Sequence, residues 1–214
     1  HTRLRTVTGV QTCALPILRI KAVTLRPDHP FTWASGIKAP IYTDNRLTIS
    51  YPDVRQHIYQ GMNDLIRRFY GEATVIAGTA TAGIPHAAWV AEELGLPMIY
   101  VRSKPKDHGQ GRQIEGALAP DAKVVVIDDL LSTGGSVLNA VKAVQKEGAE
   151  VLGVVADFSY QLPALDENFA AANLTYHTVT NYTTLIEVAE RNHMVTYAQK
   201  DSLHAWRKDP ANWG

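Results

Sequence analysis

A run of apolar residues that ends in two carboxylates and a small-residue loop constrains this chain more than any other feature. Residues 124–127 read Val-Val-Val-Ile, which is typical of a strand buried in a parallel sheet. Asp128 and Asp129 follow at the expected carboxyl end, and residues 130–136 lead into a helical pattern over residues 136–146. The stretch predicts a strand–loop–helix unit whose loop amides and helix N-terminus can hold a phosphate.

The glycines and the acidic pair indicate what this unit binds. Gly134 and Gly135 allow the backbone to approach a ligand closely, and Asp128 and Asp129 can accept hydrogen bonds from sugar hydroxyls or lie near a metal ion. Neither the Gly-Lys-Ser/Thr ending of a nucleotide-binding P-loop nor a G-x-G-x-x-G dinucleotide fingerprint is present. A ribose 5-phosphate therefore fits better, although the Asp-Asp pair alone is more typical of a turn that caps the next helix.

Strand and helix patterns alternate from residue 74 onward, which predicts an α/β fold with a doubly wound, mainly parallel sheet. The expected strands cover residues 74–77, 98–101, 124–127, 150–158 and 176–179, and the expected helices cover residues 52–70, 86–94, 136–146, 165–172, 182–191 and 199–207. In such sheets ligands bind at the carboxyl ends of the strands. Loops beginning at Gly78, Arg102 and Asp128 all fall there, so we expect them to surround one site.

Two of these loops have the composition of anion sites. Residues 78–85 (GTATAGIP) offer backbone amides for a second phosphate, with a plain tight turn as an equally good interpretation. Residues 102–112 hold four cations and His108, which favours a loop that closes over a polyanion, against the alternative of a solvated surface loop. His86, at the start of a helix, is expected to pack rather than to catalyse.

An aromatic and charged segment precedes the first long helix. A short strand is expected at residues 22–25, and residues 31–46 read as two extended pieces joined by turns. Trp, Tyr, Lys, Asp and Arg lie close together there, as in a lid over a flat anionic ligand. A simple hairpin with an aromatic packing face is the alternative.

Bulk properties exclude several classes. Lys plus Arg and Asp plus Glu both number 21 in 214 residues, so a dominant nucleic-acid footprint is not expected. No apolar run approaches the length of a membrane span. The single cysteine favours a reducing compartment, and we expect a cytoplasmic protein.

The first residues differ in character from the rest. Residues 7–17 (VTGVQTCALPI) resemble a translated sequencing-library adapter, and a genuine N-terminal arm is the alternative. The expected organisation is therefore a foreign segment over residues 1–17 and one domain over residues 18–214. On this view Cys13 is foreign, and a native N-terminal helix has been lost or overwritten.

Three segments together resemble one family. The stretch from residue 124 to 136 resembles the 5-phosphoribosyl 1-pyrophosphate (PRPP) motif of type I phosphoribosyltransferases. Residues 31–48 and residues 100–109 resemble the orotate-side segment and the catalytic loop of orotate phosphoribosyltransferases, in the form found in Gram-positive bacteria. The resemblance runs from about Leu18 to the C-terminus. It implies the type I fold, with a small hood region beside the sheet.

The resemblance also implies a reaction. The phosphoribosyl group of PRPP would pass to orotate through an oxocarbenium-like transition state, giving orotidine 5′-monophosphate and pyrophosphate in pyrimidine synthesis. Mg²⁺ would be the cofactor, carried by PRPP and with Asp128 and Asp129 as candidate protein ligands. The expected partners are the two small-molecule substrates and a second copy of the chain, in a homodimer with shared active sites. Neither nucleic acid nor a membrane is an expected partner.

Residue roles follow from the same resemblance. The catalytic residues would be Lys106, His108 and Asp129. PRPP would be bound by Arg102, Lys106, His108, Asp128, Asp129, Leu130, Leu131, Ser132, Thr133, Gly134, Gly135, Ser136, Thr81 and Ala82. Orotate would be bound by Ser132, Lys38, Tyr42 and Thr43.

Three departures from relatives remain. Some relatives have a lysine directly after the loop arginine, where this chain has Ser103, and some have a lysine at the position of Ala34. Relatives with an orotate-binding arginine after the strand that ends near Phe158 have no match in residues 158–161. The contacts to the orotate carboxylate are therefore left open. Three alternative functions also remain: a purine phosphoribosyltransferase, a non-catalytic PRPP-sensing regulator that binds nucleic acid, and a truncated, inactive gene product.

Overall fold

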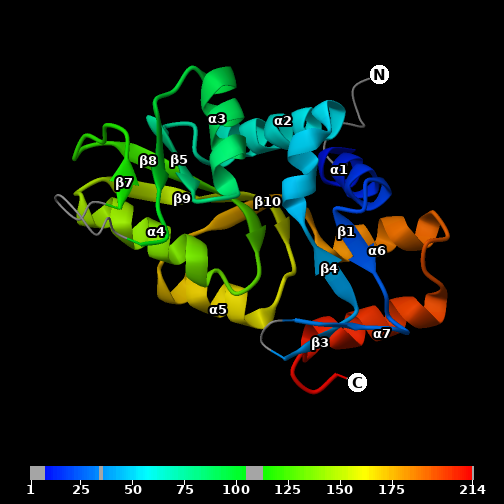
Figure 1. Ribbon diagram of the computed structural model, residues 1–214. Coiled ribbons are helices and arrows are strands. Elements are labelled where there is room, and N and C mark those ends of the chain that lie inside the picture. Colours follow the sequence, from blue (N-terminus) through cyan, green and yellow to red (C-terminus); the bar gives the residue numbers. More distant parts are fainter. Residues whose placement is uncertain (1–7, 34–35, 105–112, 214) are drawn as a thin grey trace.

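The computed structural model describes residues 8–33, 36–104 and 113–213, and its centre is a six-stranded sheet (Figure 1). The strands are β5 (Val75–Thr79), β6 (Met98–Val101), β7 (Ile114–Glu115), β8 (Lys123–Leu131), β9 (Glu150–Ser159) and β10 (Tyr176–Asn181), in the order β10-β9-β8-β5-β6-β7. All neighbours are parallel except β6 and β7. The predicted doubly wound, mainly parallel sheet is confirmed.

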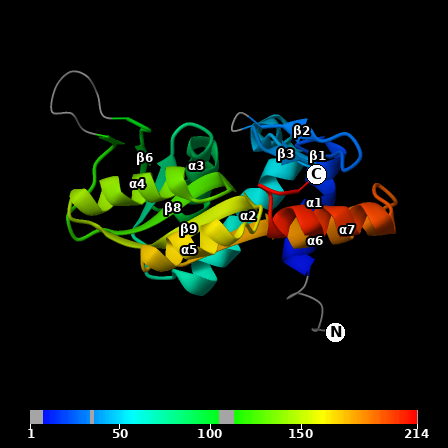
Figure 2. The same cartoon turned by 90° about the horizontal axis from the view of Figure 1, so that it is seen from below.

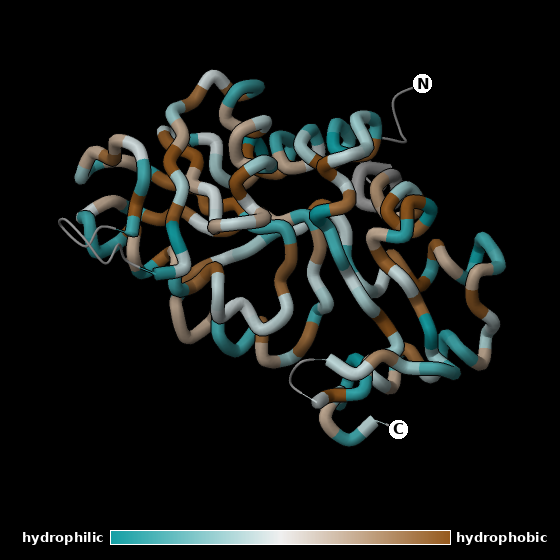
Figure 3. The backbone as a smooth tube through the Cα atoms, viewed as in Figure 1, coloured by the Kyte–Doolittle hydropathy of each residue, from teal (hydrophilic) through white to brown (hydrophobic). Residues whose placement is uncertain are grey.

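Helices cover both faces of this sheet. Figures 1 and 2 show α2 (Pro52–Phe69) and α3 (Gly83–Leu94) on one face, and α4 (Gly135–Lys146) and α5 (Pro163–Ala171) on the other. One apolar cluster joins α2 and α3 to Ile127 of β8, and a second joins α4 and α5 to Val126. Successive β-branched residues of β8 therefore pack into different layers, which explains why that strand reads as a continuous apolar run. Figure 3 shows apolar segments both in the strands of the sheet and in the helices around it.

A smaller unit, the hood, lies at the β10 end of the sheet (Figure 1). It contains β1 (Val23–Leu25) paired with β4 (Ile41–Thr43), β2 (Phe31–Thr32) paired with β3 (Lys38–Ala39), and the helices α6 (Tyr182–Arg191) and α7 (Tyr197–Lys208). Trp206 of α7 is fully buried and donates a hydrogen bond from Nε1 to the Lys38 carbonyl at 3.0 Å. Its ring meets Trp33 edge-on at 5.6 Å, so the C-terminal helix holds the N-terminal hairpins in place.

A short 3₁₀-helix, η1 (Asn45–Ser50), connects the hood to the sheet. Asn45 is buried, and its Nδ2 donates a hydrogen bond to the Asp129 carbonyl at 2.7 Å. This bond spans 84 residues of sequence, and it places the end of β4 against the end of β8.

The N-terminal segment contributes to the core. The sequence pattern predicts no helix before residue 22, whereas the structure has α1 (Thr8–Arg19), packed against α2, α6 and β10. Cys13, Ala14 and Ile17 lie at helical spacing and are buried, which explains how a short, proline-interrupted apolar run is accommodated. The foreign origin of residues 1–17, and a domain boundary at residue 18, stay predictions.

The strands at the centre of the sheet are longer than their apolar runs. β8 continues through the acidic pair to Leu131, so the expectation that the carboxylates follow the strand is wrong. The reason is backbone pairing, because Asp128 and Leu130 stay in register with Ala156 and Phe158 of β9. A parallel neighbour thus keeps polar residues in the strand.

Among the residues that the structure describes, no helix combines the length and the apolar character that crossing a membrane requires.

Candidate functional site

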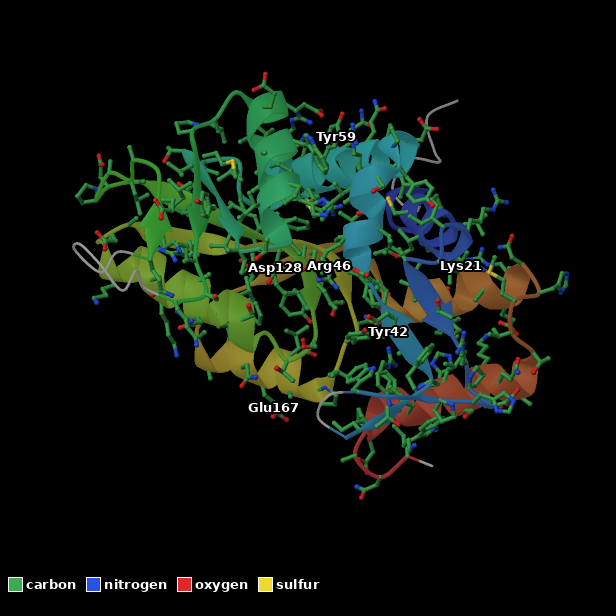
Figure 4. The ribbon with its side chains drawn as sticks, viewed as in Figure 1. Lys21, Tyr42, Arg46, Tyr59, Asp128 and Glu167 are labelled. Carbon is green, nitrogen blue, oxygen red and sulfur yellow. The ribbon has the colours of Figure 1, made fainter. Side chains whose placement is uncertain are left out.

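A pocket of about 350 Å³ opens where the hood meets the carboxyl edge of the sheet. It is lined by Thr43, Asp44, Asn45, Arg46, Thr81, Ala82, Asp129 and Leu130. Figure 4 shows Asp128 and Arg46 near the centre of the molecule, where the sheet and the hood meet. Three segments that are distant in sequence therefore form one site: the end of β4, the loop after β5 and the end of β8.

A second, smaller hollow of about 90 Å³ lies beside this pocket. It is lined by Asp128 and by residues 130–137, which contain the whole predicted phosphate loop and the first turn of α4. Gly134 has a positive φ of 81°, and the Asn168 side chain of α5 donates a hydrogen bond to the Thr133 carbonyl at 2.8 Å. The loop is thus fastened to α5, with the α4 N-terminus beside it as an anion-binding element.

Burial dominates the electrostatics of the acidic pair. Asp128 is 6% exposed, and burial followed by the charge of Asp129 raises its pKa well above the usual range. Burial also raises the pKa of Asp129, while a side-chain hydrogen bond with Asp128 and the charge of Arg46 act in the opposite direction. Both carboxylates are therefore poorly solvated acceptors, which favours ligands that bring hydroxyl donors or positive charge.

Arg46 brings a cation to this pocket. Its Nε donates a hydrogen bond to Asp44 Oδ1 at 2.8 Å, and its side chain is two-thirds exposed. The sequence indicates Asp44 and Arg46 only as members of the charged segment 31–46. Their position facing Asp129 depends on η1. The sequence carries no signal for this contact, because it joins residues more than 80 positions apart.

The loop after β5 forms the opposite wall. Gly83 packs so closely on β8 that a Cβ placed there would lie 2.6 Å from the Ile127 carbonyl oxygen. The adjoining residues Thr81 and Ala82 line the pocket, and their role as a second phosphate subsite stays a prediction. The Oγ1 atom of Thr79 is buried and has no hydrogen-bond partner among the described residues.

The basic loop begins and ends at one point on the sheet edge. The Arg102 amide donates to the Gln113 carbonyl at 2.9 Å, and Gln113 Nε2 donates to the Arg102 carbonyl at 3.0 Å. Arg102 also lies 3.9 Å from Glu115. Lys106 and His108, the predicted catalytic residues of this loop, lie outside the described residues.

The structure brings together only some of the residues predicted to bind orotate. Thr43 lines the main pocket and Ser132 lines the smaller hollow. Lys38 instead donates a hydrogen bond to Thr32 within the β2–β3 hairpin at 3.0 Å, and Tyr42 is exposed beside Phe31, with ring centroids 5.5 Å apart. Neither Lys38 nor Tyr42 is among the residues lining the pocket.

Two further residues near the site escape sequence reasoning. Tyr160 follows β9, and its amide donates to the Leu131 carbonyl at 3.1 Å. Asp157, inside β9, is completely buried. For Asp157 the sequence offers a usable signal, because a carboxylate interrupts the apolar run 154–158. For Tyr160 the sequence offers none.

His86 packs, as expected. It is fully buried, and its ring meets Trp89 edge-on at 5.6 Å. Burial lowers its pKa to about 4, so the imidazole is neutral near pH 7.

Comparison with known proteins gives one consistent answer. The family described as "Phosphoribosyl transferase domain" matches residues 50–165. The orotate phosphoribosyltransferase of Lactiplantibacillus plantarum is 63% identical over 203 residues, covering 95% of this chain and 96% of the relative. That of Enterococcus faecalis is 57% identical over 201 residues, covering 94% and 96%.

Solved structures agree with the sequence relatives. Orotate phosphoribosyltransferase from Aeropyrum pernix superposes with a TM-score of 0.70 at 25% identity, covering 86% of this chain and 99% of that one. The Mycobacterium tuberculosis enzyme in complex with PRPP superposes with a TM-score of 0.66 at 26% identity, covering 83% and 98%.

Proposed function

The chain belongs to the orotate phosphoribosyltransferase family, and from this membership we propose how its pocket is divided among the substrates. The enzyme transfers the 5-phosphoribosyl group of PRPP to orotate, in pyrimidine biosynthesis. This division of the pocket rests on the position of the two hollows. The smaller one, lined by residues 130–137, adjoins the larger pocket, which residues of the hood line on one side. A phosphate and a base therefore have separate walls on either side of one acidic pair.

The 5-phosphate is assigned to the smaller hollow. Amides of residues 132–136 and the α4 N-terminus supply donors without a bulky side chain at Gly134 and Gly135. Leu130 and Leu131 contribute backbone to the same wall. Asp128 and Asp129 then lie where the ribose hydroxyls would be, and their poor solvation favours these hydroxyl donors.

The pyrophosphate is assigned to the opposite wall and to the basic loop. Thr81 and Ala82 line the pocket next to Asp129, and Arg102 begins the loop that carries Lys106 and His108. Positive charge placed beside the departing pyrophosphate lowers the barrier more than a strong nucleophile would, because negative charge grows on the pyrophosphate while the ribosyl carbon becomes cationic as the bond breaks. We assign Lys106 to leaving-group stabilisation, and His108 to a proton or hydrogen bond donated to it.

Orotate is assigned to the hood side of the main pocket, with Thr43 as a contact there, Ser132 as a contact from the smaller hollow beside it, and Tyr42 and Lys38 as residues that reach it on closure. Thr43 lines the main pocket, and its side chain lies close enough to the Tyr160 hydroxyl to lower the pKa of that phenol, so the two groups border the same wall. Lys38 lies on β3 and Tyr42 on β4, two hood strands that follow one another in the chain.

The donors of the site fit a magnesium ion that arrives with PRPP. Asp128 and Asp129 offer hard carboxylate oxygens, and the described residues contain no cluster of three or more metal-binding side chains. Such a pair would complete the coordination of Mg²⁺ held chiefly by phosphates and water. When bound, the ion neutralises charge on the pyrophosphate.

We further propose a cytoplasmic homodimer in which the basic loop of one subunit covers the pocket of the other. The family resemblance of residues 100–109 supports the shared site, and the single cysteine, Cys13, supports a reducing compartment.

The test of the assigned roles follows orotate consumption by absorbance, with PRPP and Mg²⁺. We expect turnover that needs all three, and a loss of at least about a hundredfold in Lys106→Ala. Lys142→Ala, which removes an exposed lysine from α4, is the matched control and should leave the rate unchanged. Undiminished turnover in Lys106→Ala would refute the assigned role of the loop.

A further inference from the structure

A closed set of hydrogen bonds, the Gln161 cluster, joins the turn after β9 to both helices of the hood. Gln161 Oε1 accepts from the Thr183 amide at 3.0 Å, from Thr183 Oγ1 at 2.7 Å and from Arg207 Nη1 at 3.1 Å. Arg207 Nη1 also donates to Thr183 Oγ1 at 2.5 Å. Thr183 lies in the first turn of α6 and Arg207 in the last turn of α7, so one oxygen collects donors from both helices.

The backbone at Gln161 needs such support. Its φ is 55°, in the left-handed region that residues with a side chain rarely adopt. The Gln161 amide donates to Ser159 Oγ at 2.9 Å, which closes a three-residue turn over residues 159–161. A strained backbone persists only where its surroundings fix it, and here the Gln161 cluster fixes it.

Tyr160 is the middle residue of this turn. Its hydroxyl borders the same pocket wall as Thr43, the wall assigned to orotate. Its ring also contacts Trp206 of α7, with centroids 6.1 Å apart. A change of backbone at Gln161 would therefore move a phenol that stands at the edge of the pocket.

We propose that Gln161 and Arg207 are positioning residues for Tyr160: the Gln161 cluster holds the Tyr160 hydroxyl at the wall assigned to orotate, and the C-terminal helix thereby sets the affinity for orotate. This inference rests on the division of the pocket proposed above. Gln161 and Arg207 are not among the residues that line the main pocket or the smaller hollow, so both act through Tyr160.

The effect should be specific to orotate, because other contacts hold the PRPP side. Leu131 and Ser159 stay in register between β8 and β9, and the Tyr160 amide donates to the Leu131 carbonyl. The phosphate loop has its own anchor, the bond from the Asn168 side chain to the Thr133 carbonyl. Loss of the Gln161 cluster leaves all of these contacts in place.

Methionine at position 207 tests the donor. Arg207→Met removes the guanidinium and keeps an unbranched stem beside the Tyr182 ring, which lies 6.0 Å from the arginine Cζ. We expect the KM for orotate to rise about fivefold, with the KM for PRPP unchanged. Lys208→Met alters the adjacent, exposed residue of the same helix, and this matched control should leave both KM values unchanged.

Two substitutions at position 161 test the acceptor. Gln161→Leu removes the oxygen on which the three donors converge, so the KM for orotate should again rise about fivefold. Gln161→Glu keeps an oxygen at that place and should retain nearly the full affinity for orotate. This pair carries the test if Arg207→Met lowers the yield of folded protein, and a Gln161→Glu enzyme as impaired as Gln161→Leu would overturn the inference.

A double variant tests the route of the effect. In a Tyr160→Phe background, Arg207→Met should cause no further rise in the KM for orotate, because the hydroxyl that it positions is already gone. A further fivefold rise would show that Arg207 acts on orotate by another route. Arg207→Met with an unchanged KM for orotate, or with equal rises for both substrates, would also overturn the inference, since a merely structural role predicts no preference for orotate.

The Tyr160→Phe enzyme alone separates this inference from the proposed division of the pocket. If its KM for orotate is unchanged, the assignment of this wall to orotate fails, and the inference fails with it. If its KM for orotate rises while that of Arg207→Met does not, the wall is correctly assigned and only the positioning role is refuted.

Discussion

The phenol of Tyr160 is held rigidly at the border between the sheet and the hood. Its ring lies 5.4 Å from both Trp33 and Phe158, and burial raises its pKa to about 12, so it stays a hydrogen-bond donor at neutral pH. Thr43, which lines the pocket, is near enough to influence that pKa in the opposite direction. The hydroxyl therefore stands at the wall assigned to the base.

Removing that hydroxyl should affect one substrate. We expect Tyr160→Phe to raise the KM for orotate about tenfold, the range for one lost hydrogen bond to a charged ligand, with the KM for PRPP unchanged. Steady-state kinetics with each substrate varied in turn will measure both. Tyr182→Phe is the control: its hydroxyl donates to the Leu203 carbonyl at 2.9 Å, so stability should fall while both KM values stay constant. Equal increases in both KM values for Tyr160→Phe would contradict this role.

His86 should make the protein sensitive to mild acid. Its pKa falls from 6.5 in an exposed chain to about 4 in the folded one, with burial as the cause. Below pH 6.5 the unfolded chain binds a proton that the folded one does not, so the free energy of unfolding should drop by about 3 kcal/mol as the pH falls from 6.5 to 4.

Urea titrations across that pH range will measure the slope. His86→Gln should flatten it, and His29→Gln, which changes an exposed histidine, should leave it as it was. An unchanged slope in His86→Gln would assign the acid sensitivity to other groups.

At the scale of elements, two adjacent glycines in the phosphate loop have different structural demands. Gly134 has a φ of 81°, and a Cβ there would lie 2.9 Å from Phe169 Cε2 and 3.0 Å from Leu165 Cδ1. At Gly135 the nearest atom would be Thr133 Oγ1 at 3.9 Å. Only the first position therefore requires the absence of a side chain.

Alanine should discriminate between these positions. We expect Gly134→Ala to lower the free energy of unfolding by about 2 kcal/mol, from the left-handed backbone and the contact with α5, and Gly135→Ala to leave it within about 0.5 kcal/mol. Chemical unfolding without ligand isolates this effect from phosphate binding. Equal losses would mean that the loop is not fastened against α5 as described.

The sequence predicts the sheet well and the ends of its strands poorly. β-branched runs and turn residues place β5, β6, β8, β9 and β10, because buried parallel strands have a strong compositional pattern. Asp128, Asp129 and Ser159 are read as loop residues, yet backbone pairing between β8 and β9 keeps them in the strands. Local propensity cannot register a neighbour that arrives from another part of the chain.

The same contrast between local pattern and distant contact applies to the residues of the candidate site. The sequence predicts the positions of residues 132–136 and Thr81 beside the two pockets because each belongs to a local motif, with its glycines and its helix contiguous in sequence. Arg46 and Tyr160 were missed as residues near the pocket because their positions depend on contacts between the hood and the sheet that join distant parts of the chain. α1 was missed because its buried residues, Cys13, Ala14 and Ile17, occupy a short run that looks like an appendage.

At the scale of the whole molecule, the proposed sharing of active sites between two subunits makes a quantitative prediction. Lys106→Ala and Asp129→Asn subunits should each be inactive as homodimers. Mixed and allowed to exchange, they form hybrid dimers in which one site has an intact Asp129 from one subunit and an intact Lys106 from the other.

Random exchange makes half of the dimers hybrid, so activity should recover to about a quarter of that of the unaltered enzyme. The rate after mixing, compared with that of each variant alone, measures this directly. No recovery, despite hybrid dimers detected by native mass spectrometry, would show that each subunit closes its own pocket.

The C-terminal helix α7 packs on the N-terminal hairpins of the hood, where the Trp206 ring meets Trp33 and its Nε1 donates to the Lys38 carbonyl. During synthesis on the ribosome, the phosphate loop and most of the sheet leave the exit tunnel well before α7 does. Domains generally fold as units as they emerge, and this hood lacks its central side chain until residue 206 is free. A nascent chain can thus expose the phosphate loop long before the hood wall of its pocket is complete. The activity should therefore appear only after translation has released α7.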